Sequence, residues 1–184
     1  MKRLTTIALM ANLAIASVYA QHPVKMVFSG TGAASPIDLK QPNTSTAEEN
    51  VAGNGTLGLF TFRNVSAIAL SPEPASTCLG LFFPRVAGAG LLRFQDGSLL
   101  TVNLTQGGDC IDLVHMVGHC TLTFKINGGT DRFKNASGVL TYTETALPVL
   151  VDALNNPVFF SETGEFTGTI SGVGMEDDSQ DVRQ

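Results

Sequence analysis

The strongest candidates for chemistry in this 184-residue chain are two carboxylates, Glu144 and Glu162. In each surrounding segment apolar and polar residues alternate, and each glutamate falls on the apolar face of its predicted strand. The two segments are consecutive, so a hairpin centred near Ala153 would put Glu144 directly opposite Glu162. Facing carboxylates in an apolar cavity would share a proton, which raises one pKa, and such a group can act as a general acid or base.

Other arrangements of this pair remain open. Gly164 can mark a β-bulge that rotates Glu162 outward. Either glutamate can lie at a wet barrel rim, or can pair with Arg63 or Arg93. Because ion-pair networks also perturb carboxylates, the catalytic interpretation requires that both side chains face the interior.

Two histidines four residues apart, His115 and His119, lie near Asp112. In a continuous strand they would share a face, as metal ligands do. Gly118 indicates a turn between them, and the pattern offers no clear third ligand, so we predict no metal site. The sequence also has no Gly-x-Ser-x-Gly nucleophile elbow, phosphate loop or dinucleotide fingerprint, and we predict no cofactor.

Three cysteines, Cys78, Cys110 and Cys120, predict one disulfide and one remaining thiol in an oxidising compartment. A hairpin centred near His115 would set Cys110 and Cys120 side by side, so we expect these two to be bonded. Cys78 is the rival partner for either.

The N-terminus has the three-part pattern of a secretory signal. Lys2 and Arg3 precede an apolar stretch over residues 4–16, and small or apolar residues follow at 17–20. The stretch is shorter than the about 20 residues that a membrane-spanning helix needs. We therefore predict a signal peptide over 1–20, a domain over 21–173 that is secreted to the extracellular space or periplasm and does not span a membrane, and a disordered acidic tail over 174–184.

The charge pattern argues against several partners. The net charge is −5, 15% of the residues are charged, and no basic patch occurs, so nucleic acid and anionic lipid are poor candidates. The oligomeric state has no signal in the sequence. Five Asn-x-Ser/Thr sequons would be glycosylation sites in a eukaryotic secretory pathway, namely Asn43, Asn54, Asn64, Asn103 and Asn135.

Alternating runs dominate the chain and predict strands. Residues 36–54 and 72–90 are rich in turn formers, and we expect two long loops there. A three-residue hairpin loop over 96–98 would pair Phe94 with Leu100 and Leu92 with Val102, which keeps all four on one face. Seven or eight strands with short hairpins predict an all-β fold, a small antiparallel β-barrel of about eight strands, with a sandwich as the alternative.

One segment resembles a known family. Residues 127–138 read Asn-Gly-Gly-Thr-Asp-Arg-Phe-Lys-Asn-Ala-Ser-Gly, which resembles the Gly-Gly-Thr-Gly-x-Phe-x-x-Ala-x-Gly signature of dirigent-like and allene-oxide-cyclase-like barrels. Residues 164–170 are similar to the last strand of those proteins, and the resemblance covers about residues 119–172. Asp131 stands where the family has its third glycine, and Asp tolerates left-handed backbone. The resemblance implies a barrel and a structural turn that contains Gly128, Gly129, Thr130, Phe133 and Gly138.

The resemblance to these barrels implies the fold of the chain more strongly than it implies an activity. The leading hypothesis is a secreted domain of non-catalytic or ligand-binding role, for which the barrel offers room for a small apolar ligand. The rival is a cofactor-free isomerase or cyclase of the allene-oxide-cyclase-like type that uses Glu144 and Glu162, and a third hypothesis is a purely structural secreted protein. A cavity of about 300 Å³ or more that contains both glutamates would favour the first two. An interior filled by four aromatic rings would reject both, and these rings are Phe94, Phe124, Phe160 and Phe166.

Overall fold

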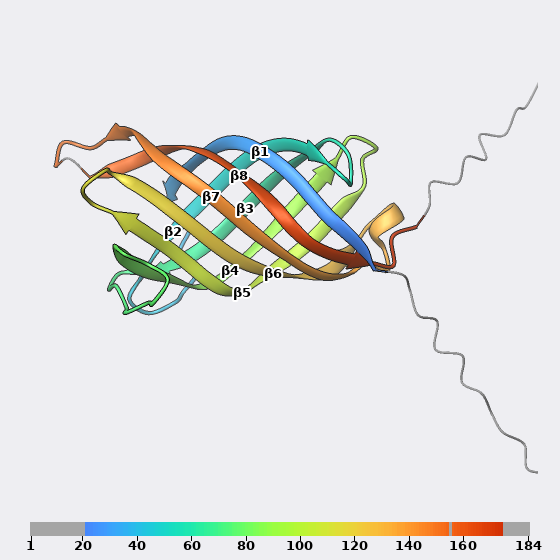
Figure 1. Ribbon diagram of the computed structural model, residues 1–184, viewed down its shortest axis with the longest axis horizontal. Helices are drawn as coiled ribbons and strands as arrows, with labels where there is room; N and C mark the ends of the chain where they lie inside the picture. The colour runs from blue at the N-terminus through green and yellow to red at the C-terminus, as the bar shows by residue number, and fades with distance from the viewer. Residues whose placement is uncertain (1–20, 155, 175–184) are drawn as a thin grey trace, which may run out of the picture.

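The chain folds into a closed antiparallel β-barrel, as a computed structural model shows for residues 21–154 and 156–174 (Figure 1). Each strand pairs with the next along the chain, and β8 returns to pair with β1. The strands are β1 (His22–Ser35), β2 (Thr44–Gly55), β3 (Phe60–Ala69), β4 (Leu81–Phe94), β5 (Leu99–Asp112), β6 (Val117–Gly129), β7 (Ser137–Val151) and β8 (Pro157–Ser171). The prediction of an all-β barrel of about eight strands is confirmed. The predicted signal peptide and residues 175–184 of the predicted tail lie outside the described residues.

Strand alternation decides which side chains enter the barrel. In β6, Leu122, Phe124 and Ile126 are buried, whereas Thr121 and Lys125 face outward. The period of two follows from the pleat, which points successive side chains to opposite faces of the sheet. The same alternation carries Glu144 and Glu162 inward.

The prediction of long loops over residues 36–54 and 72–90 is wrong, because each of these segments contains a strand. The first contains most of β2, and the second contains most of β4. Both strands turn polar or very small residues inward, among them Glu49, Arg85 and Gly90, so they lack the apolar alternation of a typical half-buried strand. Gly90 is required by packing, since a Cβ there would lie 2.3 Å from the Phe62 ring.

The β4–β5 hairpin has a three-residue loop, but it lies one residue earlier than predicted. The Phe94 amide donates to the Ser98 carbonyl oxygen over 3.0 Å, and Leu92 pairs with Leu100. The Ser98 amide donates to Asp96 Oδ1 over 2.9 Å, which helps to fix this loop. The shift moves the pairing by two residues, so the predicted inward face is kept, and Leu92, Phe94, Leu100 and Val102 are all buried.

One end of the barrel, here called the plugged end, is filled by the turn between β6 and β7. Gly128 and Asp131 have positive φ angles of 87° and 49°, which reverse the chain into the short 3-10 turn Asp131–Phe133. The Phe133 side chain is completely buried, and its ring centroid lies 4.8 Å from that of Phe94. The Arg132 guanidinium covers both rings at 4.5 and 4.9 Å from their centroids.

A layer of aromatic rings fills the middle of the barrel. Neighbouring rings in this layer have centroids 4.8 to 6.3 Å apart, and its members are Phe28, Phe62, Phe124, Tyr142 and Phe166. Packing at these distances excludes water and contributes about 0.5–1.5 kcal/mol per pair beyond area burial. Phe160, the remaining ring predicted to fill the interior, is only partly buried and lies above this layer, so the interior is not filled throughout.

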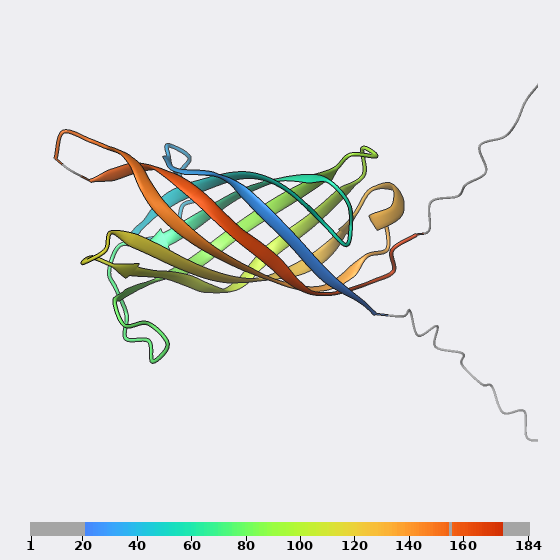
Figure 2. The same cartoon turned by 45° about the horizontal axis from the view of Figure 1, so that its top comes forward.

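The opposite end, here called the mouth, is bounded by the loops that join β1 to β2, β3 to β4, β5 to β6 and β7 to β8. Figure 2 shows these loops at the end of the barrel away from the described termini. Each of the four loops exposes a large apolar side chain: Ile37, Leu79, Val114 and Leu154. Within the described residues, no helix is long and apolar enough to cross a bilayer.

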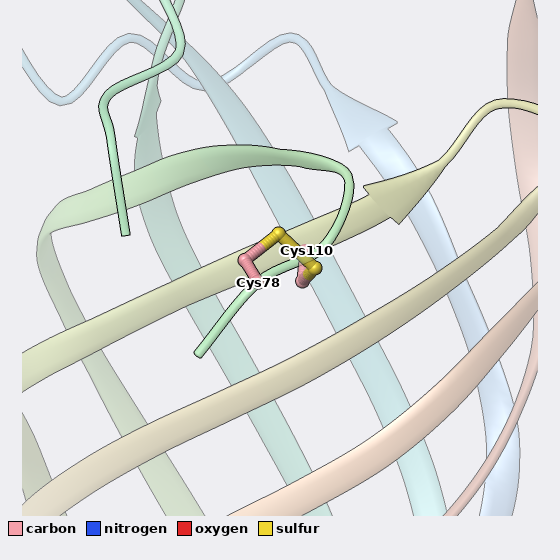
Figure 3. Close-up of a disulfide and its surroundings, with 2 residues drawn as sticks. All are labelled: Cys78 and Cys110. Carbon is pink, nitrogen blue, oxygen red and sulfur yellow. A yellow bond between two sulfur atoms is a disulfide. The ribbon is translucent and has the colours of Figure 1, made fainter. Parts of the chain in front are cut away.

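The disulfide joins Cys78 to Cys110 and fastens the β3–β4 loop to β5, with Cα atoms 5.5 Å apart (Figure 3). The predicted Cys110–Cys120 pairing is therefore wrong. In the β5–β6 ladder Cys110 lies opposite His119, and Cys120 lies opposite Asp109. This one-residue difference in register turns the two cysteines to opposite faces of the sheet. Cys120 is a free thiol inside the barrel.

Candidate functional site

A cavity of about 280 Å³ opens at the mouth of the barrel. Its upper walls are mainly apolar and include Ala33, Ile68, Phe83, Ile111, Pro148 and Phe160. Its floor is formed by ionisable side chains from β2, β4, β5, β6, β7 and β8, namely Glu49, Arg85, Asp109, Cys120, Glu144 and Glu162. An apolar chamber with a few convergent polar groups is the usual form of a small-molecule site.

Arg85 occupies the centre of this floor and is 7% exposed. Its Nε and Nη2 atoms donate to Asp109 over 3.0 to 3.2 Å. Its Nη1 atom donates to Glu49 and, over 2.8 Å, to Ser66. A buried guanidinium requires such partners, because its desolvation is costly. The single cation of the floor is therefore committed to two of the four carboxyl groups.

Asn64 completes the Glu49 side of the floor. Its Nδ2 donates to Glu49 Oε2 over 2.5 Å, and Asn64 itself is 2% exposed. The predicted sequon at this position therefore points into the barrel, where a glycan has no room. The sequons at Asn43, Asn54, Asn103 and Asn135 are on exposed residues.

Glu144 and Glu162 both face the cavity floor, with 6% and 4% of their surfaces exposed. They are diagonal neighbours, because Glu144 pairs with Gly164 and Glu162 pairs with Ala146. The predicted direct opposition is wrong by two residues. The register irregularities of this ladder lie between Pro148 and Val151, and the pairing is regular through Gly164, so Glu162 keeps its inward orientation.

The two glutamates differ in their hydrogen bonds. The Tyr142 hydroxyl donates to Glu144 Oε2. Among the described residues, Glu162 Oε2 is buried and has no hydrogen-bond partner. Neither glutamate meets Arg63 or Arg93, which are exposed on the outer surface.

Gly32 on β1 has no side chain, and this leaves room for the Glu162 carboxyl group. A Cβ at Gly32 on β1 would lie 1.8 Å from Glu162 Oε1 and 2.9 Å from its Cδ. Gly32 pairs with Phe160 across the β1–β8 ladder, two residues from Glu162. The Glu162 carboxyl group is thus held in a cradle that any larger residue at position 32 would fill.

Burial raises the pKa of both glutamates, and negative neighbours raise it further. The pKa of Glu162 rises to about 9, first through burial and then through Glu144 and Glu49. The pKa of Glu144 rises to about 7 through burial, although Arg85 opposes the rise. Glu162 is then a protonated donor at neutral pH, while Glu144 can accept a proton. Burial also raises the pKa of the Tyr142 hydroxyl and of the Cys120 thiol.

Possible metal ligands on the floor are already engaged. Asp109, Cys120 and Glu144 each offer one ligand atom, and these three atoms lie within 4.8 Å of one another. Asp109 uses both of its oxygens on Arg85, so a guanidinium already neutralises this carboxylate. The histidines considered from the sequence lie outside the barrel interior: His115 Nδ1 contacts Asp112 over 2.7 Å, and His119 is exposed.

Sequence reasoning missed Glu49, Arg85 and Asp109. Glu49 and Arg85 belong to segments that were interpreted as loops, and Asp109 precedes a cysteine in a strand segment. Arg85 did carry a signal, because it is a lone charge in the run Leu-Phe-Phe-Pro-Arg-Val-Ala. A single charge inside an apolar strand segment needs a partner when buried, and a search for that partner could have led to Glu49 and Asp109.

Comparisons with known proteins found no family model that matches the chain and no curated protein that matches it.

Proposed function

We propose that this barrel is an exported protein that binds a small, largely apolar molecule carrying one polar group. The observation that carries the proposal is the unpartnered Glu162 carboxyl oxygen at the floor of an apolar cavity of about 280 Å³. A buried polar atom without a partner costs free energy, so a ligand that supplies the missing hydrogen bond gains affinity and orientation.

Export is supported by the sequence pattern of residues 1–20 and by the Cys78–Cys110 disulfide, a bond typical of oxidising compartments. We further propose a relationship to dirigent-like and allene-oxide-cyclase-like barrels. The eight-stranded barrel and the turn at Gly128 and Asp131 support it.

The Gly32→Ala substitution tests the binding proposal. Its Cβ displaces the Glu162 carboxyl group while the backbone of the strand is spared, so affinity for a bound alcohol should fall at least tenfold. Calorimetry with 2-phenylethanol, cyclohexanol and 1-octanol measures the effect. Gly118→Ala is the matched control, because a Cβ there meets Ile111 and Ala146 at ordinary distances of 3.5 and 3.6 Å. Failure of all three alcohols to bind, or an equal loss in both variants, would reject the proposal.

A cofactor-free isomerase or cyclase is the second candidate, and the two different glutamate pKa values favour it. Glu162, with a pKa of about 9, can donate a proton to a carbonyl oxygen, while Glu144, with a pKa of about 7, takes one from the adjacent carbon. The product is an enol, and its return to the ketone puts a proton back on the same α-carbon. Protonation on the opposite face inverts that carbon, which is an isomerisation without a cofactor.

This second candidate predicts hydrogen exchange on a bound ketone. The α-hydrogens of 4-phenyl-2-butanone should exchange with D₂O in the presence of the protein, and Glu144→Gln should slow this exchange by about 100-fold or more. NMR follows the exchange directly. Glu165→Gln, on the outer face of β8, should leave the rate unchanged. A rate no greater than that of buffer would eliminate the enzyme hypothesis and leave the binding proposal intact.

A further inference from the structure

The floor of the cavity has more carboxyl groups than cations. Four buried carboxyl groups meet there, Glu49, Asp109, Glu144 and Glu162, and all are at most 8% exposed. Within the described part of the chain, the one cation among them is Arg85, and its donors go to Glu49 and Asp109. Glu144 and Glu162 therefore share a buried space in which neither carboxyl group receives a hydrogen bond from Arg85, although the Arg85 charge acts on both at longer range.

We propose that the cavity selects small apolar amines, whose ammonium group binds between Glu144 and Glu162. This inference rests on the proposed binding function and names the class of its ligand. An ammonium group has three N–H donors and no acceptor, so it suits a space bordered by carboxylate oxygens. Glu162 Oε2 is free to receive one of them. The apolar walls, among them Phe83, Ile111 and Phe160, would contact the hydrocarbon part of the amine.

Anionic and neutral ligands fit this floor less well. A carboxylate ligand would bring a fifth acidic group beside the four that are already there, and like charges in a low-dielectric interior repel strongly. An alcohol can share a hydrogen bond with Glu162 but brings no charge. A charge-assisted hydrogen bond is about twice as strong as a neutral one, which favours the amine.

Binding of an amine must displace protons from the floor. The groups that face the two glutamates are Glu49 on β2, Arg85 on β4, Asp109 on β5, Cys120 on β6 and Tyr142 on β7. Burial and the neighbouring carboxylates raise the pKa of Glu144 and Glu162, so both tend to hold protons in the empty cavity. An ammonium ion favours their ionised forms, and a proton is released for each carboxyl group that ionises.

The proton release fixes the direction of the pH dependence. An alkyl amine remains protonated up to about pH 9, as a lysine does. Its affinity should therefore rise from pH 6 to pH 8, by up to about tenfold per pH unit where one carboxyl group loses its proton on binding. The affinity of a matched alcohol should change little or fall over the same pH range, because the alcohol binds more tightly to the protonated carboxyl group.

A matched ligand series tests this inference by calorimetry on the folded chain, residues 21–184. The probes are 2-phenylethylamine, 2-phenylethanol and 3-phenylpropanoate, which share a phenyl ring and differ in charge. We expect the amine to bind at least tenfold more tightly than the alcohol at pH 8, and the carboxylate to bind most weakly. The heat of amine binding should also depend on the ionisation enthalpy of the buffer, which reports the released proton.

Two variants separate the ammonium contact from the rest of the cavity. Glu144→Gln and Glu162→Gln should each reduce amine affinity to near the level of the alcohol, with smaller effects on the alcohol itself. Glu165→Gln, a carboxylate on the outer face of β8, should leave all affinities unchanged. If a variant fails to fold, the buffer dependence measured on the unaltered chain still decides the question.

The possible outcomes distinguish this inference from the binding proposal. If the alcohol binds as tightly as the amine at pH 8, the cavity is a binding site but not an amine site. If amine binding releases no proton, the ammonium group does not lie between the two glutamates. If none of the three probes binds, both proposals fall.

Discussion

Replacing Arg85 with methionine should destabilise the barrel by about 3–5 kcal/mol at pH 7. The substitution removes the cation that bonds to Asp109 and Glu49 and leaves both carboxyl groups buried without it. Methionine has a similar length and fills the same space, so the loss reflects charge and hydrogen bonding more than a cavity. Urea unfolding followed by circular dichroism measures the effect.

Arg93→Met is the matched control for this experiment. Arg93 belongs to the same strand, β4, but its side chain is on the exposed face, so its removal should change stability by about 0.5 kcal/mol or less. Adding Glu49→Gln to Arg85→Met should recover part of the loss, because one of the uncompensated carboxylates is then neutral. Equal stabilities for the two arginine variants would contradict the central role assigned to Arg85.

Stability should fall as pH rises from about 5 to 8, and the Glu162→Gln variant should remove much of this fall. Glu162 keeps its proton in the folded chain up to a pKa of about 9, whereas in the unfolded chain the proton leaves near the ordinary value of 4.5. The folded state then binds more protons than the unfolded state, so raising the pH favours unfolding. Glu144, with a folded pKa of about 7, contributes in the same direction at lower pH.

The variant separates this effect from general pH sensitivity. At pH 8, Glu162→Gln should be more stable than the unaltered chain by about 3 kcal/mol, or roughly 6–12 °C in the thermal midpoint. At pH 4 the two should differ little, since the glutamate is protonated in both the folded and the unfolded state. Glu165→Gln serves as the control. Parallel pH curves for the unaltered chain and Glu162→Gln would show that Glu162 is not held protonated.

The barrel was predictable because most strands alternate clearly, and the inward direction of Glu144 and Glu162 followed from that alternation. The two missed strands, β2 and β4, have the polar floor residues Glu49 and Arg85 on their inner faces, so a rule that expects apolar residues inside cannot find them. The polar floor is thus the reason for the error as well as the basis of the proposed function.

The register in which neighbouring strands pair was the second feature that the sequence could not predict. The disulfide prediction failed because a shift of one residue exchanges the faces of Cys110 and Cys120. The direct opposition of Glu144 and Glu162 failed because the β7–β8 hairpin is centred one residue later than predicted, with Val151 paired with Pro157, and this offset moves the pairing of both glutamates by two residues. Both depend on contacts between neighbouring strands, which the alternation within one strand does not contain.

Within the described residues, Phe133 and the aromatic layer fill the barrel below the floor, which gives the cavity the shape of a cup with one opening. A molecule whose polar head bonds to Glu162 must then enter head first and leave tail first. Its tail would lie beside Met116, Val117 and Pro157, which line the cavity at this end of the barrel. If the proposed binding function holds, the bottom of the cavity would select the polar head, while the loops around the opening would set the accepted tail length and the rate of dissociation.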